Sequence, residues 1–403
     1  MNATAENRIF ISFLIILLLV IILLSCLSLI FPNNNFYERM INIKPLNGPV
    51  KWSKDKSCNS SLGKVVNDTL NSNNIKETNN NDYAVYFPCS YNFINHEIQK
   101  IKPTNPEQRF FIINNADQIS SKNGIWKNLV SLYNREGAQK LMPSTYVLHD
   151  PQDRQLFQRE FSSNKLYILK KNIQRQLGLK ITRDYNDIVN AHNEGFVIVQ
   201  ELLQDPYLIN GRKINMRFYL LIICQGGQVA SYVHRNGFMY YTKEPFVKNS
   251  LKDTHNVTTG YIDRTVYETN PLTQEDFRKY LDNHNRKLYP EETDLLQNNL
   301  QISTEVFNRI YSLLLKVTLA VKNKICLDAN LKDNITFQLF GADVSLSDTL
   351  VPHLMEINKG PDLATKDEKD SNIKHQVVND VFKVIKVIPD EPRSEFIKLH
   401  DDY

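Results

Sequence analysis

The stretch FQLFGADVSL at residues 337–346, followed closely by HLMEINKGPDL at residues 353–363, decides the fold of this chain. Both segments are rich in strand-forming apolar residues, and two paired strands are predicted over 337–346 and 351–357. Residues two apart on a strand share a face, so Glu356 and Asn358 project together beside Asp343 on the neighbouring strand. Three oxygen ligands of this kind favour binding of Mg²⁺. The alternative is that these polar strand residues simply face solvent.

The rest of the chain supplies elements of both kinds around this pair. An apolar run at 218–224, a turn at 225–228 and a second run at 229–233 predict a β-hairpin. Further strands are expected over 109–113, 166–169 and 196–200, and helices over 125–132 and 303–321, the second capped by Ser303. Helical segments interspersed with mostly antiparallel strands predict an α+β fold.

Composition excludes some classes of partner. The 403 residues suffice for two or three domains, and a net charge of +4 is small for that length. No basic run with interleaved aromatic residues occurs, so the sequence does not indicate a nucleic-acid partner.

The cysteines are few and widely spaced. Their positions, at 26, 58, 89, 224 and 326, contain no CxxC or Cys/His metal spacing, so neither a zinc site nor a disulfide scaffold is indicated. A bridge between Cys58 and Cys89 would fit an oxidising compartment, whereas free thiols in a reducing one are the favoured interpretation.

A membrane segment is predicted near the N-terminus. Residues 9–31 carry no charge and, as a helix, would span roughly 34 Å, enough for a bilayer core of about 30 Å. A cleaved signal peptide is the alternative, but the run is long for one and lacks a good cleavage site. Lysine and arginine are more frequent after the segment than before it, which predicts a cytosolic body, whereas glycosylation sequons at Asn59 and Asn67 point the other way.

Several ordered blocks resemble the tubulin–tyrosine ligase-like family over roughly residues 82–390. The family's G-x-D and E-x-N strands are similar to 341–343 and 356–358, and its K-F-D-L-R block to KINMR at 213–217. DPYLINGR at 205–212 is similar to its N-P-L-L-I-x-G stretch, VQELL at 199–203 to its adenine hinge, and YILKK at 167–171 to its W-I-x-K-P block. The resemblance implies an ATP- and Mg²⁺-dependent carboxylate–amine ligase of the ATP-grasp type. Its expected substrates are an amino-acid donor and a protein or peptide acceptor.

The resemblance also implies a domain plan and a set of site residues. The expected plan is a tail at 1–8, a transmembrane helix at 9–31, a polar linker at 32–82, an N-terminal subdomain at 83–165, and two ATP-grasp subdomains at 166–204 and 205–403. ATP would contact a set of six residues, namely Lys122, Lys170, Gln200, Glu201, Leu203 and Lys213. Arg217 and Lys213 would act on the transferring groups, Asp343, Glu356 and Asn358 would hold Mg²⁺, and residues 174–178 would form a loop over the phosphates.

The chain departs from the family pattern in the region expected to hold the amino acid. Asn215 stands where the family has Asp, and Tyr240 stands where it has Arg. A degenerate ATP-grasp module that binds nucleotide or a partner at a membrane without turnover is therefore an alternative. A third hypothesis is a membrane-anchored structural protein that shares only the fold.

Overall fold

The computed structural model describes residues 41, 43–46, 48–55, 58, 62–90, 93–173, 178–283 and 301–399. The predicted transmembrane segment at 9–31 and most of the predicted phosphate loop lie outside these ranges. Within them, no helix is both long and apolar enough to cross a membrane. Residues 43–403 form one compact unit.

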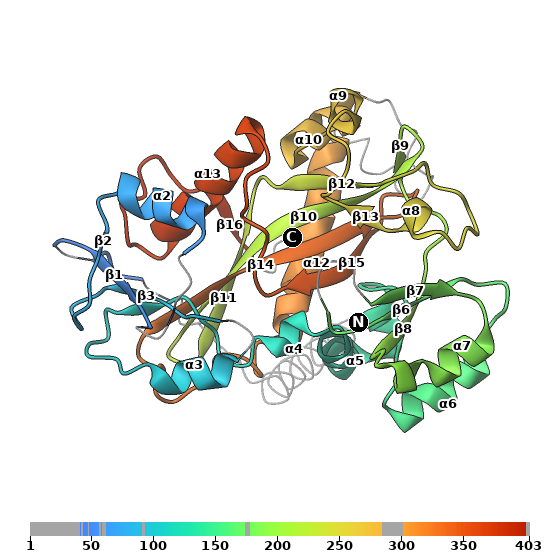
Figure 1. Cartoon of the computed structure of the whole chain (residues 1–403), viewed down its shortest axis with the longest axis horizontal. Coiled ribbons are helices and arrows are strands. Elements are labelled where there is room, and N and C mark those ends of the chain that lie inside the picture. The colour runs from blue at the N-terminus through green and yellow to red at the C-terminus, as the bar shows by residue number, and fades with distance from the viewer. Residues whose placement is uncertain are drawn as a thin grey trace, which may run out of the picture. The chain divides into compact units, whose positions relative to one another are not determined.

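A mixed sheet runs through this unit and, within the described residues, contains twelve strands (Figure 1). Its central path is β13-β12-β10-β14-β4-β3-β1-β2, and β9, β11, β15 and β16 pair alongside it. The bounds are β1 Lys51–Lys54, β2 Lys76–Glu77, β3 Val85–Phe87, β4 Arg109–Phe110, β9 Leu208–Ile209, β10 Arg212–Gln225, β11 Gln228–His234, β12 Phe238–Thr242, β13 Thr258–Thr259, β14 Ile335–Leu346, β15 Pro352–Asn358 and β16 Phe396–Lys398.

Two long strands form the centre of this sheet, and nearly all of their residues are buried. All of β14 is buried, and β10 is buried apart from Arg212, Asn215 and Gln225, which are half-buried. The two pair antiparallel, β14 continues antiparallel to β15, and β10 to β11, so both predicted strand pairs are confirmed. From β14 through β4 and β3 to β1 the pairing is parallel, which the mainly antiparallel expectation did not include.

A second, smaller sheet has the antiparallel order β5-β8-β6-β7. Its strands are β5 Thr145–Val147, β6 Tyr167–Lys170, β7 Leu179–Thr182 and β8 Ile198–Glu201. Two helices pack on it around Phe157 and Ile188, namely α6 Pro151–Glu160 and α7 Tyr185–Asn190 (Figure 1). The predicted start of this subdomain at 166 is about 20 residues late, because β5 pairs with β8 across more than 50 residues of sequence.

Helices cover the main sheet. The longest is α12 Ile302–Val321, which crosses the sheet beside β10 and β14 in Figure 1 and adds Phe307, Ile310 and Leu314 to the core. Ser303 does not cap it: Gln301 holds the N-cap position, and the Ser303 hydroxyl donates to Asp282. The other segments are α2 Lys64–Ser72, α3 Ile94–Lys100, α4 Asp117–Ser120, α5 Lys122–Gln139, η1 Ala191–Glu194, α8 Asp253–Asn256, α9 Val266–Thr269, α10 Gln274–Asn283 and α13 Glu368–Val384.

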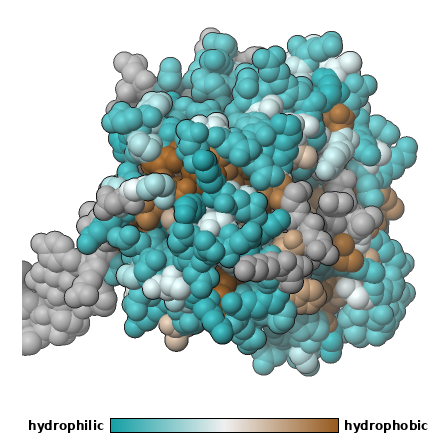
Figure 2. Space-filling view, turned by 60° about the vertical axis from the view of Figure 1, so that its left-hand side comes forward, coloured by the Kyte–Doolittle hydropathy of each residue, from teal (hydrophilic) through white to brown (hydrophobic). Residues whose placement is uncertain are grey.

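The surface of the body is mostly polar. On the face shown in Figure 2, hydrophilic residues predominate and hydrophobic residues gather in a few small areas. The α+β expectation is confirmed for the folded unit. Its main apolar core includes residues of β10, β14, α5 and α12, and the small sheet has separate apolar clusters within the described residues.

The polar linker expected over 32–82 is partly folded. Residues 51–54 form β1, which lies between β2 and β3 in the sheet, and residues 64–72 form α2. Trp52, Val65 and Leu70 are buried. Few apolar residues were enough here because a sheet edge and α13 already offer a surface for them, which a sequence window cannot reveal.

The cysteines also differ from expectation. The structure pairs Cys58 with Cys89 and Cys224 with Cys326, with Cα atoms 5.4 Å and 5.8 Å apart. The Cys58–Cys89 bridge is the alternative weighed above, and the favoured free-thiol interpretation was wrong for it. The Cys224–Cys326 bridge was not anticipated, because spacing does not identify partners 102 residues apart.

Candidate functional site

The three predicted oxygen donors meet where β14 and β15 pair. Asp343 lies directly opposite Glu356, and Asn358 lies opposite Gly341. The Asn358 amide donates to Glu356 Oε1 at 3.2 Å, so the two residues share a face as the strand period requires. The register shifts between Asp343 and Val344, an irregularity that is common where a strand presents side chains to a site.

Arg217 is already bound to one of these acids. It lies opposite Asp343 across the β10–β14 pair, donating from Nε to Oδ1 at 2.5 Å and from the guanidinium Nη2 to Oδ2 at 2.9 Å. Burial alone would lower the pKa of Arg217, but the Asp343 carboxylate outweighs this and raises that pKa well above its usual value. The pair is thus a charged, buried fork, and the carboxylate oxygens keep further lone pairs for a cation.

The space for this fork comes from a glycine. A Cβ added to Gly341 would lie 3.1 Å from Cδ and Nη1 of Arg217. On the other side, the Tyr240 ring lies 5.2 Å from the guanidinium carbon, a cation–π distance. Tyr240, the residue that departs from the family pattern, therefore packs against Arg217 and does not replace its charge.

Two of the predicted lysines lie near these acids, and the third, Lys213, lies near Lys170. Lys122, at the start of α5, has its Nζ 3.6 Å from Glu356 Oε2 and donates to the Ile173 carbonyl at 3.4 Å. Lys170, in β6, donates to Gln200 Oε1 at 2.7 Å. Lys213 is buried in β10 with no hydrogen-bond partner among the described residues. The small sheet, α5 and the main sheet thus each contribute one lysine.

Burial makes Lys170 and Lys213 weaker bases. Desolvation, with Lys122 and Lys213 nearby, lowers the pKa of Lys170 to about 8, despite the opposing charges of Glu356 and Asp343. Desolvation also lowers the pKa of Lys213 to about 8. Burial raises the pKa of Glu356, but the charges of Lys122 and Lys170 more than offset it, and the pKa is lowered overall.

The site carries more positive than negative charge. Four cationic side chains face two carboxylates, which leaves two positive charges in excess when all are ionised. Buried lysines without a counter-ion are stabilised by an anion. The Asn215 side-chain oxygen, on the same face of β10 as Lys213 and Arg217, is also shielded from solvent without a partner. The site therefore fits an anionic ligand that also offers a hydrogen-bond donor or a cation.

The predicted hinge residues lie at the end of β8 but have different surroundings. Gln200 is fully buried, and its side chain joins Lys170 to the Thr145 hydroxyl. The Glu201 carboxylate pairs with Lys165 at 2.9 Å, away from the lysine cluster. Leu203 follows the strand, and its backbone N–H donates to no described residue, so of the three it is the one with a main-chain donor free for a ligand.

Two supporting residues were missed at the level of sequence. The Asn172 side chain accepts from the Lys122 backbone N–H at 3.1 Å, and Thr145 holds Gln200. Both act across about 50 residues of chain, and no local pattern marks either residue.

Comparison with known proteins adds independent information. The model of the "Tubulin-tyrosine ligase family" matches residues 99–395. Probable tubulin polyglutamylase ttll-9 of Caenorhabditis elegans is 24% identical over 298 residues, covering 69% of this chain and 64% of its own. A probable beta-tubulin polyglutamylase of Tetrahymena thermophila is 26% identical, over 66% of this chain and 23% of its own. Tubulin glycylase 3B of Drosophila melanogaster is 25% identical, over 58% of this chain and 30% of its own.

The matched region is a part of each relative. The chain spans between 23% and 64% of the length of these three proteins. The matched family region begins after β1 and α2 and includes every predicted site residue from Lys122 to Asn358.

Proposed function

The chain belongs to the tubulin-tyrosine ligase family, and from that membership we propose that it is an ATP- and Mg²⁺-dependent ligase joining an amino acid to a carboxylate of a protein or peptide. The observation that carries the proposal is the approach of Lys122 and Lys170 to Glu356, with Lys213 close enough to Lys170 to lower its pKa. The three lysines come from three separate elements, and the site has two positive charges in excess. Such an excess suits the negative charge of a nucleoside triphosphate.

The lysines would bind the phosphates. ATP carries about four negative charges, and ammonium groups offset phosphate charge as compact point cations. Lys213 has no partner among the described residues and would gain one, while Lys170 would keep Gln200 as a support that fixes its direction. The Leu203 backbone N–H would serve the adenine edge.

Asp343, Glu356 and Asn358 would hold Mg²⁺. Two carboxylates and one amide oxygen are the hard donors that this ion prefers. When bound, the ion neutralises phosphate charge during transfer. Burial raises the pKa of Asp343, and Arg217 opposes that rise while orienting the carboxylate through its two hydrogen bonds.

The reaction requires positioning more than a reactive side chain. An acceptor carboxylate oxygen bonds to the γ-phosphorus as the bond to ADP breaks, giving an acyl phosphate. The amine of the donor then attacks the acyl carbon, loses a proton, and displaces phosphate to form the amide. Arg217 and Lys213 would stabilise charge on the transferring phosphoryl group, and orientation would supply much of the rate.

The donor and acceptor are proposed only as classes. The relatives are named for adding glutamate or glycine to tubulin. Asn215 and Tyr240 border Arg217 in this chain, where the family carries a carboxylate and an arginine. We therefore propose an amino-acid donor and a polypeptide acceptor without assigning either to tubulin chemistry. A tether formed by residues 9–31 is part of the proposal.

One observation favours the degenerate alternative. Both Asp343 oxygens accept hydrogen bonds from Arg217, an arrangement that would also suit a module that binds nucleotide without turnover. The two functions share ATP binding and differ in product formation, so a single series of measurements separates them.

Binding of ATP in the presence of Mg²⁺ to the detergent-solubilised full chain tests the site. Glu356→Ala removes a proposed ligand and should weaken binding by about 10- to 100-fold, measured by calorimetry. Glu136→Ala is a matched control, because that side chain is 81% exposed on α5, and it should bind as the wild type does.

Product formation then separates the two functions. Amide-linked incorporation of a labelled amino acid into a polypeptide with equal release of ADP supports the ligase. Nucleotide binding with no ADP release across donors and acceptors supports the degenerate module. Equal affinity in the wild type and Glu356→Ala would exclude the proposed metal site.

A further inference from the structure

All four cysteines within the described residues are paired. Cys58 follows β1, and Cys89 follows β3, so their bridge joins the ends of two neighbouring parallel strands. Cys224 lies near the end of β10, and Cys326 lies in the segment after α12. Cα separations of 5.4 Å and 5.8 Å fall in the usual range for disulfides. Two independent pairs leave no described cysteine over.

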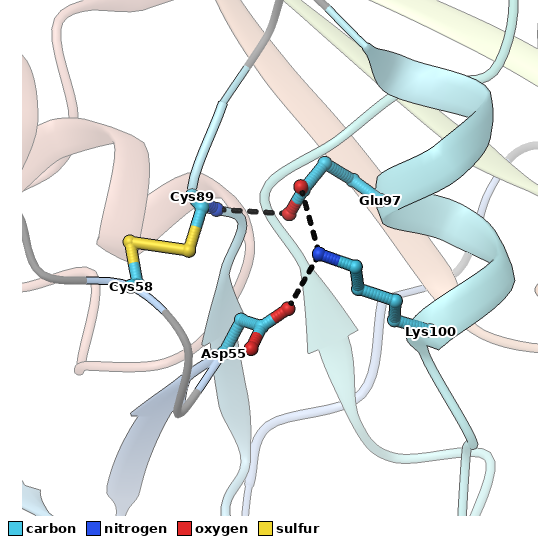
Figure 3. Close-up of a disulfide and its surroundings, with 5 residues drawn as sticks. All are labelled: Asp55, Cys58, Cys89, Glu97 and Lys100. Atoms are coloured by element: carbon cyan, nitrogen blue, oxygen red, sulfur yellow. Dashed lines mark hydrogen bonds and ion pairs between the residues drawn. A yellow bond between two sulfur atoms is a disulfide. The ribbon is translucent and has the colours of Figure 1, made fainter.

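The Cys58–Cys89 bridge lies within a network of charged groups (Figure 3). The Cys89 backbone N–H donates to Glu97 Oε2 at 3.0 Å. Lys100 bridges Glu97 and Asp55, with its Nζ 3.4 Å and 3.0 Å from their oxygens. The segments that carry the two cysteines are therefore held by contacts other than the sulfur–sulfur bond, so their proximity belongs to the fold.

The Cys224–Cys326 bridge reaches the strand that carries the site. Cys224 is on β10, the strand of Lys213 and Arg217, and is buried. Cys326 donates its backbone N–H to the Asn114 carbonyl at 3.3 Å. The bridge closes a separation of 102 residues and connects the central strand to the end of the longest helix.

We propose that this body folds and works in an oxidising compartment, and, resting on the ligase function proposed above, that its acceptor is a polypeptide of that same compartment. Disulfides persist where no thiol pool reduces them, as in the secretory lumen or outside the cell. Each bridge forms when two thiols lose two electrons and two protons to a protein disulfide donor, which leaves as a dithiol. Cytosolic tubulin would then not be the acceptor.

The proposal opposes the orientation expected from charge bias around residues 9–31. That bias predicts a cytosolic body, whereas the bridges place the body on the other side of the membrane. Charge bias reports only on the residues that flank the segment, whereas the bridges lie within the folded body. The oxidation state of the four cysteines distinguishes a cytosolic body from one in an oxidising compartment.

The first experiment reads the thiols of the full chain isolated from a eukaryotic host, with alkylation at lysis. Denaturation without reductant should leave positions 58, 89, 224 and 326 unmodified, and reductant should expose all four. Peptide mapping should find the linked pairs 58–89 and 224–326. Free thiols at these positions, alone or with bound zinc, would overturn the proposal.

Variants separate linked from merely adjacent cysteines. Loss of either partner should lower the Tm by several degrees, on the order of 5 °C, because it releases the same loop. Cys224→Ala, Cys326→Ala and the double variant should therefore shift the Tm by nearly equal amounts, and the Cys58 and Cys89 series should behave likewise. Additive shifts in both series would contradict the bridges, even where one variant folds poorly.

The compartment is tested in sealed vesicles from the same cells. The body should resist an added protease until detergent opens the vesicles, and an antibody to the extreme C-terminus is a suitable probe. Digestion in intact vesicles would overturn the proposal. ATP binding measured in parallel keeps the outcomes distinct, because the ligase proposal survives if the body proves cytosolic and reduced.

Discussion

At the scale of single residues, the site contains more positively charged side chains than carboxylates. Arg217 is paired with Asp343 through two hydrogen bonds, and Lys122 is near Glu356. Lys170 and Lys213 are then left with neutral or no described partners, and burial lowers the pKa of both. The low pKa of both lysines therefore reflects their burial without an adjacent counter-ion.

The affinity for ATP should fall as pH rises. An anion favours protonated lysine and raises its pKa. Binding is therefore strongest below about pH 8, where Lys170 and Lys213 are charged without ligand, and it weakens progressively above that pH. Between pH 7 and pH 9 the Kd should increase about tenfold for each lysine. Calorimetry near pH 8 in buffers of different ionisation enthalpy should also detect proton uptake on binding.

Substitution of one lysine provides the control for this pH effect. Lys213→Met should bind more weakly at pH 7 and should lose about half of the pH dependence on a logarithmic scale. A Kd that stays constant from pH 7 to pH 9 in the wild type would show that these lysines do not face the phosphates.

At the scale of elements, the close pairing of β12, β10 and β14 fixes the geometry of the site. Lys213, Asn215 and Arg217 share one face of β10, and the antiparallel register sets Arg217 against both Phe238 and Asp343. Gly237, immediately before β12, lies against the Arg217 backbone: an added Cβ would be 2.2 Å from its carbonyl oxygen. The glycine is needed for this approach and not for an unusual backbone angle.

Gly237→Ala should therefore destabilise the sheet next to the site. The new methyl group would also lie 2.8 Å from Gln274 Nε2, which donates to the Arg217 carbonyl at 2.9 Å. The Arg217 backbone and the buried Gln274 side chain cannot move away easily. We therefore expect a loss of about 3 kcal/mol in the free energy of unfolding. Urea unfolding of the two proteins measures it.

Gly360→Ala is the matched control for this prediction. A Cβ at Gly360 meets no atom within 4 Å, and the change should alter stability by less than about 0.5 kcal/mol. Equal unfolding midpoints for Gly237→Ala and Gly360→Ala would mean that β10 and β12 do not approach as closely as described.

At the scale of the whole molecule, the folded body begins well before the family region. Strand β1 lies between β2 and β3, and α2 packs on α13, where Asn73 donates to Asn379 at 3.1 Å. Their removal would expose the edge of β3 and the apolar residues beneath α2, and would delete Cys58.

Truncation should distinguish this boundary from the one expected at residue 83. A fragment of residues 43–403 should unfold at the same midpoint as the full chain, because residues 43–403 form one compact unit. A fragment of residues 83–403 should unfold at least about 5 °C lower or aggregate through the exposed strand edge. Thermal unfolding by circular dichroism compares them, and equal midpoints would assign residues 43–82 to a linker after all.

Local patterns determined much of this protein. Segments rich in strand-forming apolar residues predicted β14 and β15, and the turn at 225–228 predicted the β10–β11 hairpin, because such signals depend on neighbours in sequence. The ordered blocks indicated the family, and of the residues expected from it the fold places Lys122 and Arg217 beside Glu356 and Asp343 and directs Glu201 elsewhere. The segment at 9–31 and the loop at 174–177 lie outside the described residues and stay predictions.

Tertiary structure alone decided the partners. The fork between Arg217 and Asp343 joins residues 126 apart, the cysteine pairs lie 31 and 102 apart, and β1 joins a sheet whose other strands come from across the chain. A sequence window contains no information about which distant groups share a neighbourhood. Charge balance, burial and disulfide pairing all depend on that neighbourhood, and so they follow only from the folded chain.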